Sequence, residues 1–193
     1  QRPDLPESEK AAYLSIIKEE SDHVSRLIEQ LMLLARSDAN EFSIERLPLP
    51  LDELIVSTTE KMRPAIEEKG LHLYVSGEPV EVKGDEIRLK QVLVNILDNA
   101  RKYTATGDII VRYGVNETGP YFQVRDTGIG ISQESLPHVT KRLYRSEPSR
   151  SRSRGGSGLG LTIASAIVQA HGATLEIQSQ KNSGTRVIVQ WKG

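Results

Sequence analysis

The stretch Asp85–Thr104, DEIRLKQVLVNILDNARKYT, decides the fold that the sequence predicts. At the helical rotation of about 100° per residue, its apolar side chains gather on one arc. The arc consists of Leu89, Val92, Leu93, Ile96, Leu97 and Ala100. An arc of this width marks the side of a helix that packs on other elements, so we predict a helix with one face in a core.

A polar stripe runs beside this arc. Asn95, Asn99 and Lys102 follow i, i+4, i+7 spacing and therefore share one side of the helix, at the rim of the core. Two amides and an ammonium there could coordinate a hard cation through oxygen and neutralise phosphate. Because Arg88 and Gln91 belong to the same stripe, the helix alone also allows a solvated polar face.

The composition suits either one medium-sized domain or a domain with an appendage. The chain has 193 residues, 37% of them hydrophobic, and a formal net charge of −1, so it gives no general case for nucleic-acid binding. It has no cysteine, which excludes disulfides, thiolate metal sites and cysteine nucleophiles. No apolar run approaches the roughly 20 residues of a membrane span. We therefore expect this chain to be cytoplasmic and without direct membrane contact. Its polar N-terminal stretch resembles that of a fragment or a processed chain.

Residues 8–36 have the pattern of one long amphipathic helix. Its apolar residues recur largely at spacings of three and four, and they are Leu14, Ile17, Val24, Leu27, Leu31 and Leu34. A stripe this long calls for a partner helix, which this sequence does not supply. Residues 37–50 combine turn formers with prolines. We therefore expect a first domain at 1–37, a linker at 38–50 and a second domain at 51–193.

The second domain is predicted to contain segregated helices and strands. The expected helices are 51–69, with a kink or break at Pro64, then 85–104 and 159–171. The expected strands are 71–76, 80–83, 109–117, 119–126, 173–180 and 185–191. Since the two kinds of element do not strictly alternate, we predict an α+β fold, a two-layer sandwich with helices on one face of a mixed sheet.

Asp126 ends the predicted strand 119–126 on its apolar face, because it shares parity with Phe122 and Val124. Burying an unpaired carboxylate costs several kcal/mol, so a hydrogen-bond donor should face it. The amino group of a ligand would serve. A turn or N-cap aspartate before Thr127 is the alternative.

Two glycine-rich segments follow this strand. Gly128 and Gly130 in DTGIGIS permit close backbone approach or a positive φ. Residues 155–161, GGSGLGL, lead into a helix and so offer backbone N–H groups and a positive dipole end to an anion. Neither segment is a Walker A motif, and each alone would be a weak signal. The basic segment Lys141–Arg154 could close over phosphates or be a solvated loop.

The order of these motifs is specific: N-x-x-x-N-A-x-K-Y-T on a helix, D-x-G-x-G after a strand, and a basic loop into G-G-S-G-L-G-L. With this order, residues 48–193 resemble the catalytic, ATP-binding domain of sensor histidine kinases, in the superfamily that includes gyrase B and MutL. The resemblance implies the Bergerat-type ATP-binding fold. Residues 8–36 likewise look like the second helix of the family's dimerisation and phosphotransfer hairpin.

The resemblance also implies a site for Mg²⁺ and ATP. Asn99 would coordinate the metal, with Asn95 beside the phosphates and Lys102 in contact with phosphate. Tyr103 would lie along the nucleotide, and Asp126 would accept a hydrogen bond from the adenine amino group. The other residues implied to bind the nucleotide are Gly128, Gly130, Ile131, Arg145, Arg154, Gly156, Gly158, Leu159, Gly160, Leu161 and Thr185. Among these, the choice of phosphate-binding arginines in the lid stays open.

Two features depart from the family pattern. Thr140 and Leu143 stand where the family often has two phenylalanines before the lid, which puts the anchoring of the lid by Leu143 in question. The phosphoacceptor motif His-Glu-x-x-x-Pro is also absent. None of the four histidines starts that motif, and they are His23, His72, His138 and His171. The accepting histidine is therefore expected on a helix missing from this chain.

Asn95 bears on the reaction. Gyrase-like ATPases carry glutamate at the matching position to activate water, and an amide cannot accept that proton. The sequence therefore predicts the catalytic fragment of a histidine kinase, which donates the γ-phosphate of ATP to a histidine of its parent for relay to a response regulator receiver domain. The fragment alone is expected not to phosphorylate itself. By the resemblance, the parent would form a homodimer through the helical hairpin and be anchored in a membrane.

Two alternatives come from other functional classes. The first is a gyrase- or MutL-like ATPase whose cycle drives dimerisation, and Asn95 counts against it. The second is a nucleotide-binding interaction module without catalysis, which the missing acceptor histidine allows. A related serine-directed protein kinase is also conceivable, and the identity of the acceptor would distinguish it.

Overall fold

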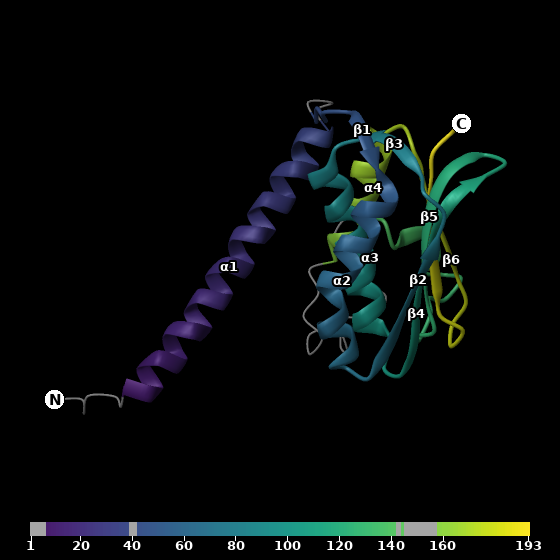
Figure 1. Ribbon diagram of the computed structural model, residues 1–193. Helices are drawn as coiled ribbons and strands as arrows, with labels where there is room; N and C mark the ends of the chain where they lie inside the picture. Colours follow the sequence, from purple (N-terminus) through teal and green to yellow (C-terminus); the bar gives the residue numbers. More distant parts are fainter. Residues whose placement is uncertain (1–6, 39–41, 142–143, 145–157) are drawn as a thin grey trace. The chain divides into compact units, whose positions relative to one another are not determined.

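The computed structural model describes residues 7–38, 42–141, 144 and 158–193, and the chain divides into two compact units, Gln1–Glu41 and Phe42–Gly193. The first unit contains one long helix, α1 (Glu7–Asp38), drawn in purple in Figure 1. The helix predicted at 8–36 is thus confirmed. Its apolar stripe is largely exposed, with Leu14 at 66% and Ile17 at 63%. Among the described residues, no helix combines the length and apolar character that crossing a membrane requires.

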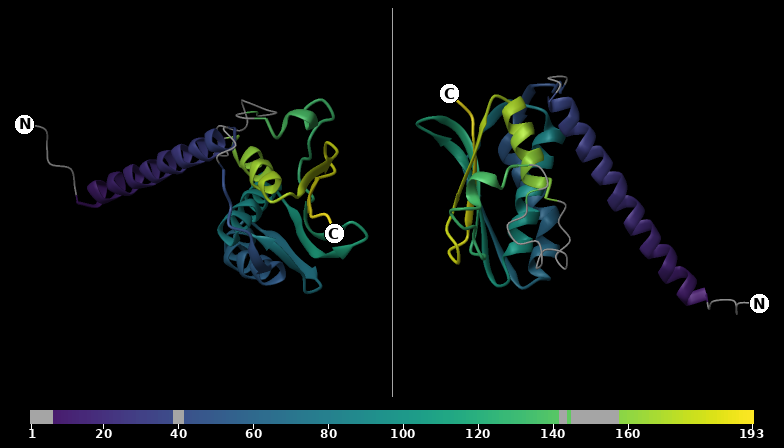
Figure 2. Two further views of the ribbon diagram at one scale, coloured as in Figure 1. Left: turned by 90° about the horizontal axis from the view of Figure 1, so that it is seen from above. Right: turned by 180° about the vertical axis from the view of Figure 1, so that it is seen from behind.

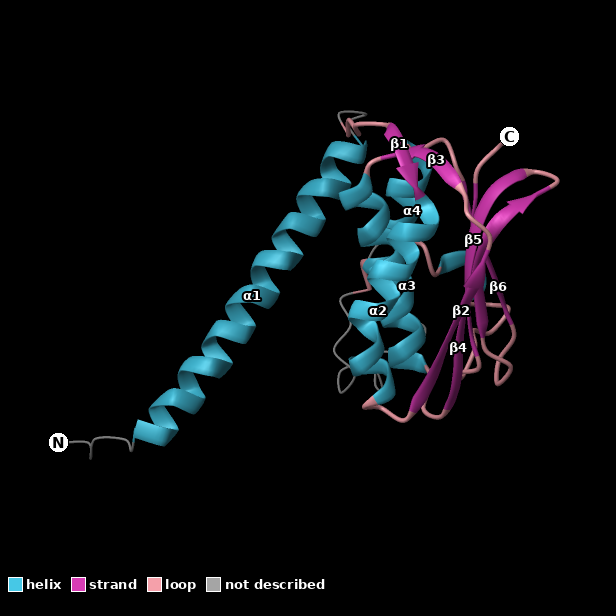
Figure 3. Cartoon of the chain, viewed as in Figure 1, coloured by secondary structure: helices cyan, strands magenta, loops and turns pink. Residues whose placement is uncertain are grey.

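The second unit is a two-layer sandwich, with helices on one face of a mixed sheet (Figures 1 and 3). The sheet has five strands in the order β2-β4-β5-β7-β6, in which β2 runs parallel to β4 and the other neighbours are antiparallel. The strands are β2 (Leu71–Gly77), β4 (Gly107–Asn116), β5 (Gly119–Asp126), β6 (Thr174–Ser179) and β7 (Thr185–Gln190). The helices are α2 (Leu51–Glu67), α3 (Glu86–Tyr103) and α4 (Gly160–Ala170). The predicted α+β sandwich is confirmed.

The core lies between α3 and the middle of the sheet. All six residues of the predicted apolar arc are buried, none more than 4% exposed. They face the strands whose inward residues are Ile109, Val111, Phe122 and Val124. Helices α2 and α4 flank α3 on either side, as the end-on view of Figure 2 shows. Truncating an arc residue such as Leu97 to alanine would cost about 2–5 kcal/mol, because the packed neighbours cannot fill the space.

The start of α3 is capped as its sequence suggests. Asp85 adopts an extended conformation, and its carboxylate accepts a hydrogen bond from the backbone N–H of Arg88 at 3.1 Å. An aspartate in this role satisfies one of the N–H groups that lack an intrahelical partner and stabilises the helix by about 1 kcal/mol. The helix therefore begins at Glu86, directly after this cap.

The segment before α2 differs from the prediction. Residues 47–50, assigned to the linker, form strand β1 (Leu47–Pro50), which pairs antiparallel with β3 (Glu81–Gly84) in a separate two-stranded sheet. Two prolines favoured a linker there, but proline is compatible with a strand that has a free edge, and both strands of a pair have one. The second compact unit, which begins at Phe42, therefore includes β1.

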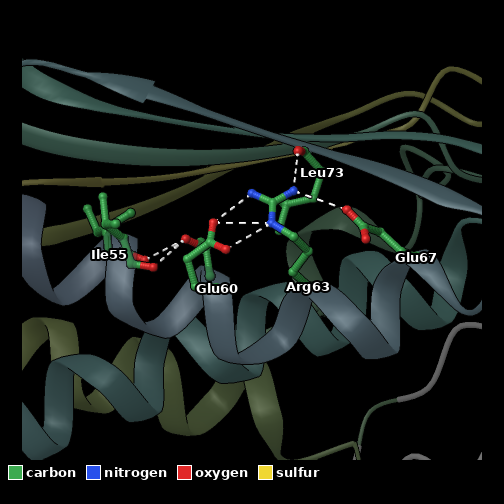
Figure 4. Close-up of polar contacts among 7 residues, drawn as sticks. Ile55, Glu60, Arg63, Glu67 and Leu73 are labelled. Carbon is green, nitrogen blue, oxygen red and sulfur yellow. Dashed lines mark hydrogen bonds and ion pairs between the residues drawn. The ribbon is translucent and has the colours of Figure 1, made fainter.

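A kink or a break was predicted at Pro64, and helix α2 continues through this residue without a break. A proline this near the end of a helix removes one backbone hydrogen bond, and Glu68 N–H still bonds to the Pro64 carbonyl at 2.9 Å. Arg63 supports this turn. Its guanidinium contacts Glu60 at 2.8 Å, Glu67 at 3.2 Å and the Leu73 carbonyl of β2 at 3.0 Å (Figure 4).

Candidate functional site

The polar stripe of α3 meets the N-terminus of α4. The side-chain Nδ2 of Asn95 donates to the carbonyl of Gly160 at 3.2 Å. A Cβ placed on Gly160 would lie 3.8 Å from the side chains of both Asn95 and Asn99. Leu159, at the N-cap of α4, gives the helix no side-chain cap, so the first N–H groups and the positive dipole end of α4 lie beside two asparagines. We call Asn95, Asn99 and Gly160 the amide end of the site.

The oxygens at the amide end are suited to a hard cation. The Oδ1 atoms of Asn95 and Asn99 accept no hydrogen bond from any described residue, and both side chains are half-buried. Amide oxygens are ligands that Mg²⁺ and Ca²⁺ accept. Within the described ranges, no group of three His, Cys, Asp or Glu side chains could hold a metal. A cation at this end would therefore need further oxygens, such as those of a ligand's phosphates.

Lys102 lies on the predicted stripe, but its ammonium is already engaged. Its Nζ is 2.7 Å from one oxygen of Asp98, and Arg101 contacts the other oxygen at 2.9 Å. Burial favours a higher pKa for Asp98, yet the hydrogen bonds from Lys102 and Arg101 hold that pKa below its ordinary value. Asp98 was not predicted as a site residue, although its i, i+4 spacing to Lys102 was a signal for this ion pair.

Asp126 closes β5 at the other end of the site and is only 8% exposed, as its parity predicts. Its Oδ1 accepts the N–H of Gly128 at 2.8 Å and that of Thr185 at 3.3 Å. Burial raises the pKa of Asp126 above its ordinary value, and these two backbone hydrogen bonds only partly oppose it. Asp126 thus has the predicted role in the turn, but this role uses only its Oδ1. Oδ2 accepts no hydrogen bond from a described residue, so it could accept one from a ligand.

The D-x-G-x-G loop passes close to the protein's own backbone. A Cβ on Gly128 would lie 2.4 Å from the carbonyl oxygen of Tyr103, and one on Gly130, whose φ is 64°, would lie 2.0 Å from that of Gln180. Ile129 N–H donates to the same Tyr103 carbonyl at 3.1 Å. The glycines therefore let the loop join the last turn of α3, where the Tyr103 side chain is 38% exposed, to the β6–β7 turn.

Thr185 and Ile131 also reach this region. Thr185 is the register partner of Asp126 across the β5–β7 pair. The backbone N–H of Ile131 donates to Ser179 Oγ at 2.9 Å, and the hydroxyls of Ser179 and Thr185 are 2.9 Å apart. We call Tyr103, Asp126 and Thr185 the carboxylate end of the site.

Two residues at the carboxylate end were missed in the sequence. Gly184 has a φ of 86°, and a Cβ there would lie 2.0 Å from the carbonyl oxygen of Asp126. Its place in a turn between two predicted strands was the signal for a required glycine. Ser179 carried no signal, because a serine at the end of a strand is common.

The predicted lid falls mainly outside the described residues. Leu143, Arg145, Arg154 and Gly156 all lie there. The described chain resumes at Gly158, whose φ of 73° is a left-handed conformation that glycine readily adopts. Leu159 is buried and Leu161 is half-buried at the start of α4, so these two residues fix the helix whose N-terminus faces the asparagines.

His171, just after α4, joins the end of that helix to the start of α3, on the far side from the site. Its Nε2 accepts the N–H of Asp85 at 3.0 Å, and its Nδ1 lies 2.8 Å from the Ile167 carbonyl. These partners require the neutral ring with the proton on Nδ1. Burial lowers the pKa of His171 and outweighs the opposing influence of the Ile167 carbonyl.

The comparisons with known proteins agree with this geometry. Residues 84–192 match the family described as histidine kinase-, DNA gyrase B-, and HSP90-like ATPase, and the chain belongs to this family. The fold and the position of the sequence motifs make the second unit an ATP-binding catalytic domain of the histidine kinase type. The resemblance to the ATP-binding domain of sensor histidine kinases, which the order of the motifs indicated, is therefore confirmed.

The similar proteins include a sensor protein and a structure with a bound nucleotide analogue. Sensor protein SrrB of Staphylococcus aureus (strain NCTC 8325 / PS 47) is 34% identical over 179 residues, which cover 92% of this chain and 31% of SrrB, so this chain spans about a third of that relative. Full-length ShkA in complex with AMPPNP has a TM-score of 0.82 at 25% identity, covering 96% of this chain and 40% of ShkA.

Two further solved structures are similar. The mycobacterial sensor histidine kinase MprB has a TM-score of 0.66 at 28% identity, covering 77% of this chain and 97% of the MprB chain. The Acinetobacter baumannii histidine kinase AdeS, at 19% identity and a TM-score of 0.76, shares the fold. The predicted Bergerat-type sandwich behind a long helix is therefore one that histidine kinases have.

Proposed function

We propose that the chain binds Mg²⁺-ATP and performs the catalytic half of a protein-histidine kinase reaction. It would donate the γ-phosphate to a histidine carried by another part of its parent protein. The observation that carries this proposal is the amide end, where two asparagine side chains lie against the uncapped N-terminus of α4. That arrangement binds anionic oxygens and holds a cation without offering a general base.

The carboxylate end would bind the adenine base. Asp126 is buried, and its Oδ2 accepts no hydrogen bond from a described residue, so this oxygen suits the exocyclic amino group of adenine. The partly exposed ring of Tyr103 would lie along the nucleotide. Gly128 and Gly130 would act by fixing the loop behind the base, as their contacts with the protein backbone suggest.

The amide end would bind the phosphates. Asn99 Oδ1 would ligate Mg²⁺, with Asn95 beside it, and the metal would neutralise charge on the phosphate oxygens. The first N–H groups of α4, near Gly158 and Gly160, would bind phosphate oxygens directly. Lys102 would share its ammonium between Asp98 and phosphate. Arg145 and Arg154 are candidates for further phosphate contacts from the lid.

The chemistry favours a histidine acceptor over water. A neutral imidazole nitrogen is itself a nucleophile, so it attacks the γ-phosphorus without a base; the new N–P bond forms as the bond to the ADP oxygen breaks. Water would need to lose a proton, and the amide of Asn95 cannot accept one. The site therefore positions and neutralises charge, which is most of what phosphoryl transfer requires.

The first unit fits the same proposal. We assign residues 1–37 to the second helix of a dimerisation and phosphotransfer hairpin and residues 51–193 to the catalytic domain. The exposed apolar stripe of α1 supports pairing with a first helix that carries the acceptor histidine. The parent would be a membrane-anchored homodimer with this part in the cytoplasm, and it would pass the phosphate to a response regulator receiver domain.

Calorimetric titration with AMPPNP, with and without Mg²⁺, tests the site. We expect saturable binding that Mg²⁺ strengthens, and Asn99→Ala should remove most of that Mg²⁺ effect, about tenfold in affinity. Gln91→Ala is the matched control, because Gln91 is half-buried on the same stripe one turn before Asn95. A folded chain that binds no nucleotide would contradict the proposal.

A transfer assay then tests the acceptor. With ATP labelled at the γ-phosphate, a separate helix hairpin bearing the acceptor histidine should take up acid-labile, base-stable label, and this chain alone should take up none. Steady ATP hydrolysis without any hairpin would favour the gyrase-like ATPase. Acid-stable label on the acceptor would favour a serine-directed kinase.

A further inference from the structure

The hydroxyl of Ser179, the last residue of β6, has three partners at short distances. It accepts the N–H of Ile131 at 2.9 Å and donates to the carbonyl of Gly184 at 2.8 Å. It also lies 2.9 Å from the hydroxyl of Thr185. Three contacts on one small side chain are unusual, because a serine hydroxyl has only one proton and two acceptor positions.

The count of protons fixes the direction of each bond. The Gly184 carbonyl has no proton, so the Ser179 proton must point to it. Ser179 therefore accepts both from Ile131 N–H and from the Thr185 hydroxyl. All donor and acceptor positions of Ser179 are then used, and the Thr185 hydroxyl proton is directed toward β6.

The segments that Ser179 joins are the two that hold Asp126. Ile131 ends the D-x-G-x-G loop, whose Gly128 N–H donates to Asp126 Oδ1 at 2.8 Å. Thr185 begins β7 and donates its own N–H to the same oxygen at 3.3 Å. Asp126 and Ser179 thus tie the loop to the start of β7 at two separate points.

We propose that Ser179 is a positioning residue for nucleotide binding, which holds the D-x-G-x-G loop on β7 so that both amide donors stay on Asp126. This role rests on the proposed function of the site. Ser179 does not itself contact the nucleotide. Without its hydroxyl, Ile131 N–H and the Gly184 carbonyl lose a partner and the Thr185 hydroxyl can rotate, so Asp126 is held less firmly.

The test compares Ser179→Ala, Ser179→Thr and a matched control, with ADP as the probe. At a temperature where each protein is folded, Ser179→Ala should weaken ADP binding about tenfold, and Ser179→Thr should restore it because the hydroxyl is kept. The control is Thr174→Ala at the opposite end of β6, whose hydroxyl also contacts the β7 backbone, at Gln190. It should leave ADP binding unchanged.

Amide NMR spectra without nucleotide supply a second readout. In Ser179→Ala, the Gly128 and Thr185 amide signals should shift upfield, and the Ile131 amide should exchange faster with solvent. Should Ser179→Ala not fold, Ser179→Cys keeps a similar volume but only a weak donor and acceptor, and it should show the same losses.

The outcomes separate the two proposals. If the wild type binds ADP and Ser179→Ala binds it equally well, the role of Ser179 is overturned and the proposed function stands. Equal loss in Ser179→Ala and Ser179→Thr also overturns the role, since the hydroxyl would not matter. If the wild type binds no ADP, the proposed function and the role of Ser179 fail together. Unaltered amide signals in Ser179→Ala would show that the loop does not need the hydroxyl, and would also overturn the role.

Discussion

The carboxylate end and the amide end of the site are built in different ways. At the carboxylate end, backbone N–H groups and carbonyls hold Asp126 and the end of α3 in place. At the amide end, the Oδ1 atoms of Asn95 and Asn99 have no hydrogen-bond donor among the described residues. The carboxylate end is therefore preformed before a ligand binds. At the amide end, the polar side chains become ordered only when a ligand and its cation bind.

The largest effect is expected from Asp126→Asn. The change removes the acceptor Oδ2, so ADP binding should weaken about a hundredfold in a calorimetric titration. The same change should raise the melting temperature of the nucleotide-free chain at pH 7, because it removes a buried charge while Oδ1 still accepts both amides. Asp108→Asn, on the neighbouring strand, is the control. A variant that binds ADP normally would contradict the role of the carboxylate end.

Adding one methyl group should distinguish the ends by their packing. Gly128→Ala places a Cβ 2.4 Å from the Tyr103 carbonyl and should lower the free energy of unfolding by about 1–3 kcal/mol. Gly160→Ala has its nearest contacts at 3.8 Å and should leave that free energy unchanged or slightly higher. Urea unfolding of both variants measures the difference. Equal destabilisation would show that the carboxylate end is no more tightly built than the amide end.

A smaller effect is expected from Asp98→Asn at the amide end. The carboxylate pairs with Lys102, so removing its charge should take away one group that competes with phosphate for the ammonium. Since both side chains are about a quarter to a third exposed, at 24% and 32%, AMPPNP affinity should rise only about threefold. The gain should shrink at high salt, because exposed charges are screened. Weaker binding would show instead that Asp98 is needed to hold Lys102 in place.

The smallest expected effect is on the pH dependence of stability. It comes from His171, which connects the end of α4 to the start of α3. Because burial lowers the pKa of His171 in the folded chain, the unfolded chain binds its proton first as pH falls below the ordinary 6.5. Stability from the neutral ring is therefore complete above that value and is lost as pH falls through it. Urea unfolding at pH 7.5 and 5.5 should show this loss. His171→Gln should show a shallower pH dependence, and the exposed His72→Gln should not.

The sequence alone was sufficient to predict the parts of the fold and the site that depend on local periodicity. The arc of α3 is buried residue for residue, and the parity of β5 places Asp126 inward. These predictions hold because a helix or strand repeats regularly, and because burying apolar area is the dominant stabilising term. The same periodicity placed Asn95 and Asn99 on one side of α3, where the structure brings them to α4.

The remaining features depend on contacts between distant residues. Nothing local in residues 47–50 shows that residues 81–84 will pair with them. The sequence showed that Gly128 and Gly130 allow close approach, but their neighbours turned out to be the carbonyls of Tyr103 and Gln180. Ser179 and Asp98 matter through partners whose positions only the folded chain defines. Long-range pairing of this kind leaves no periodic pattern.

The small β1–β3 sheet has a mechanical consequence. Leu47 pairs with Gly84 and Pro50 with Glu81, so the chain enters β1 and leaves β3 at the same end of the ladder. Tension along the chain toward its N-terminus would peel such a pair one rung at a time rather than shear all rungs together, and peeling needs less force. The first rung to open is at Gly84, beside the cap of α3 at Asp85. A pull on the boundary between the two units would thus reach the helix of the polar stripe before it loaded any strand of the five-stranded sheet.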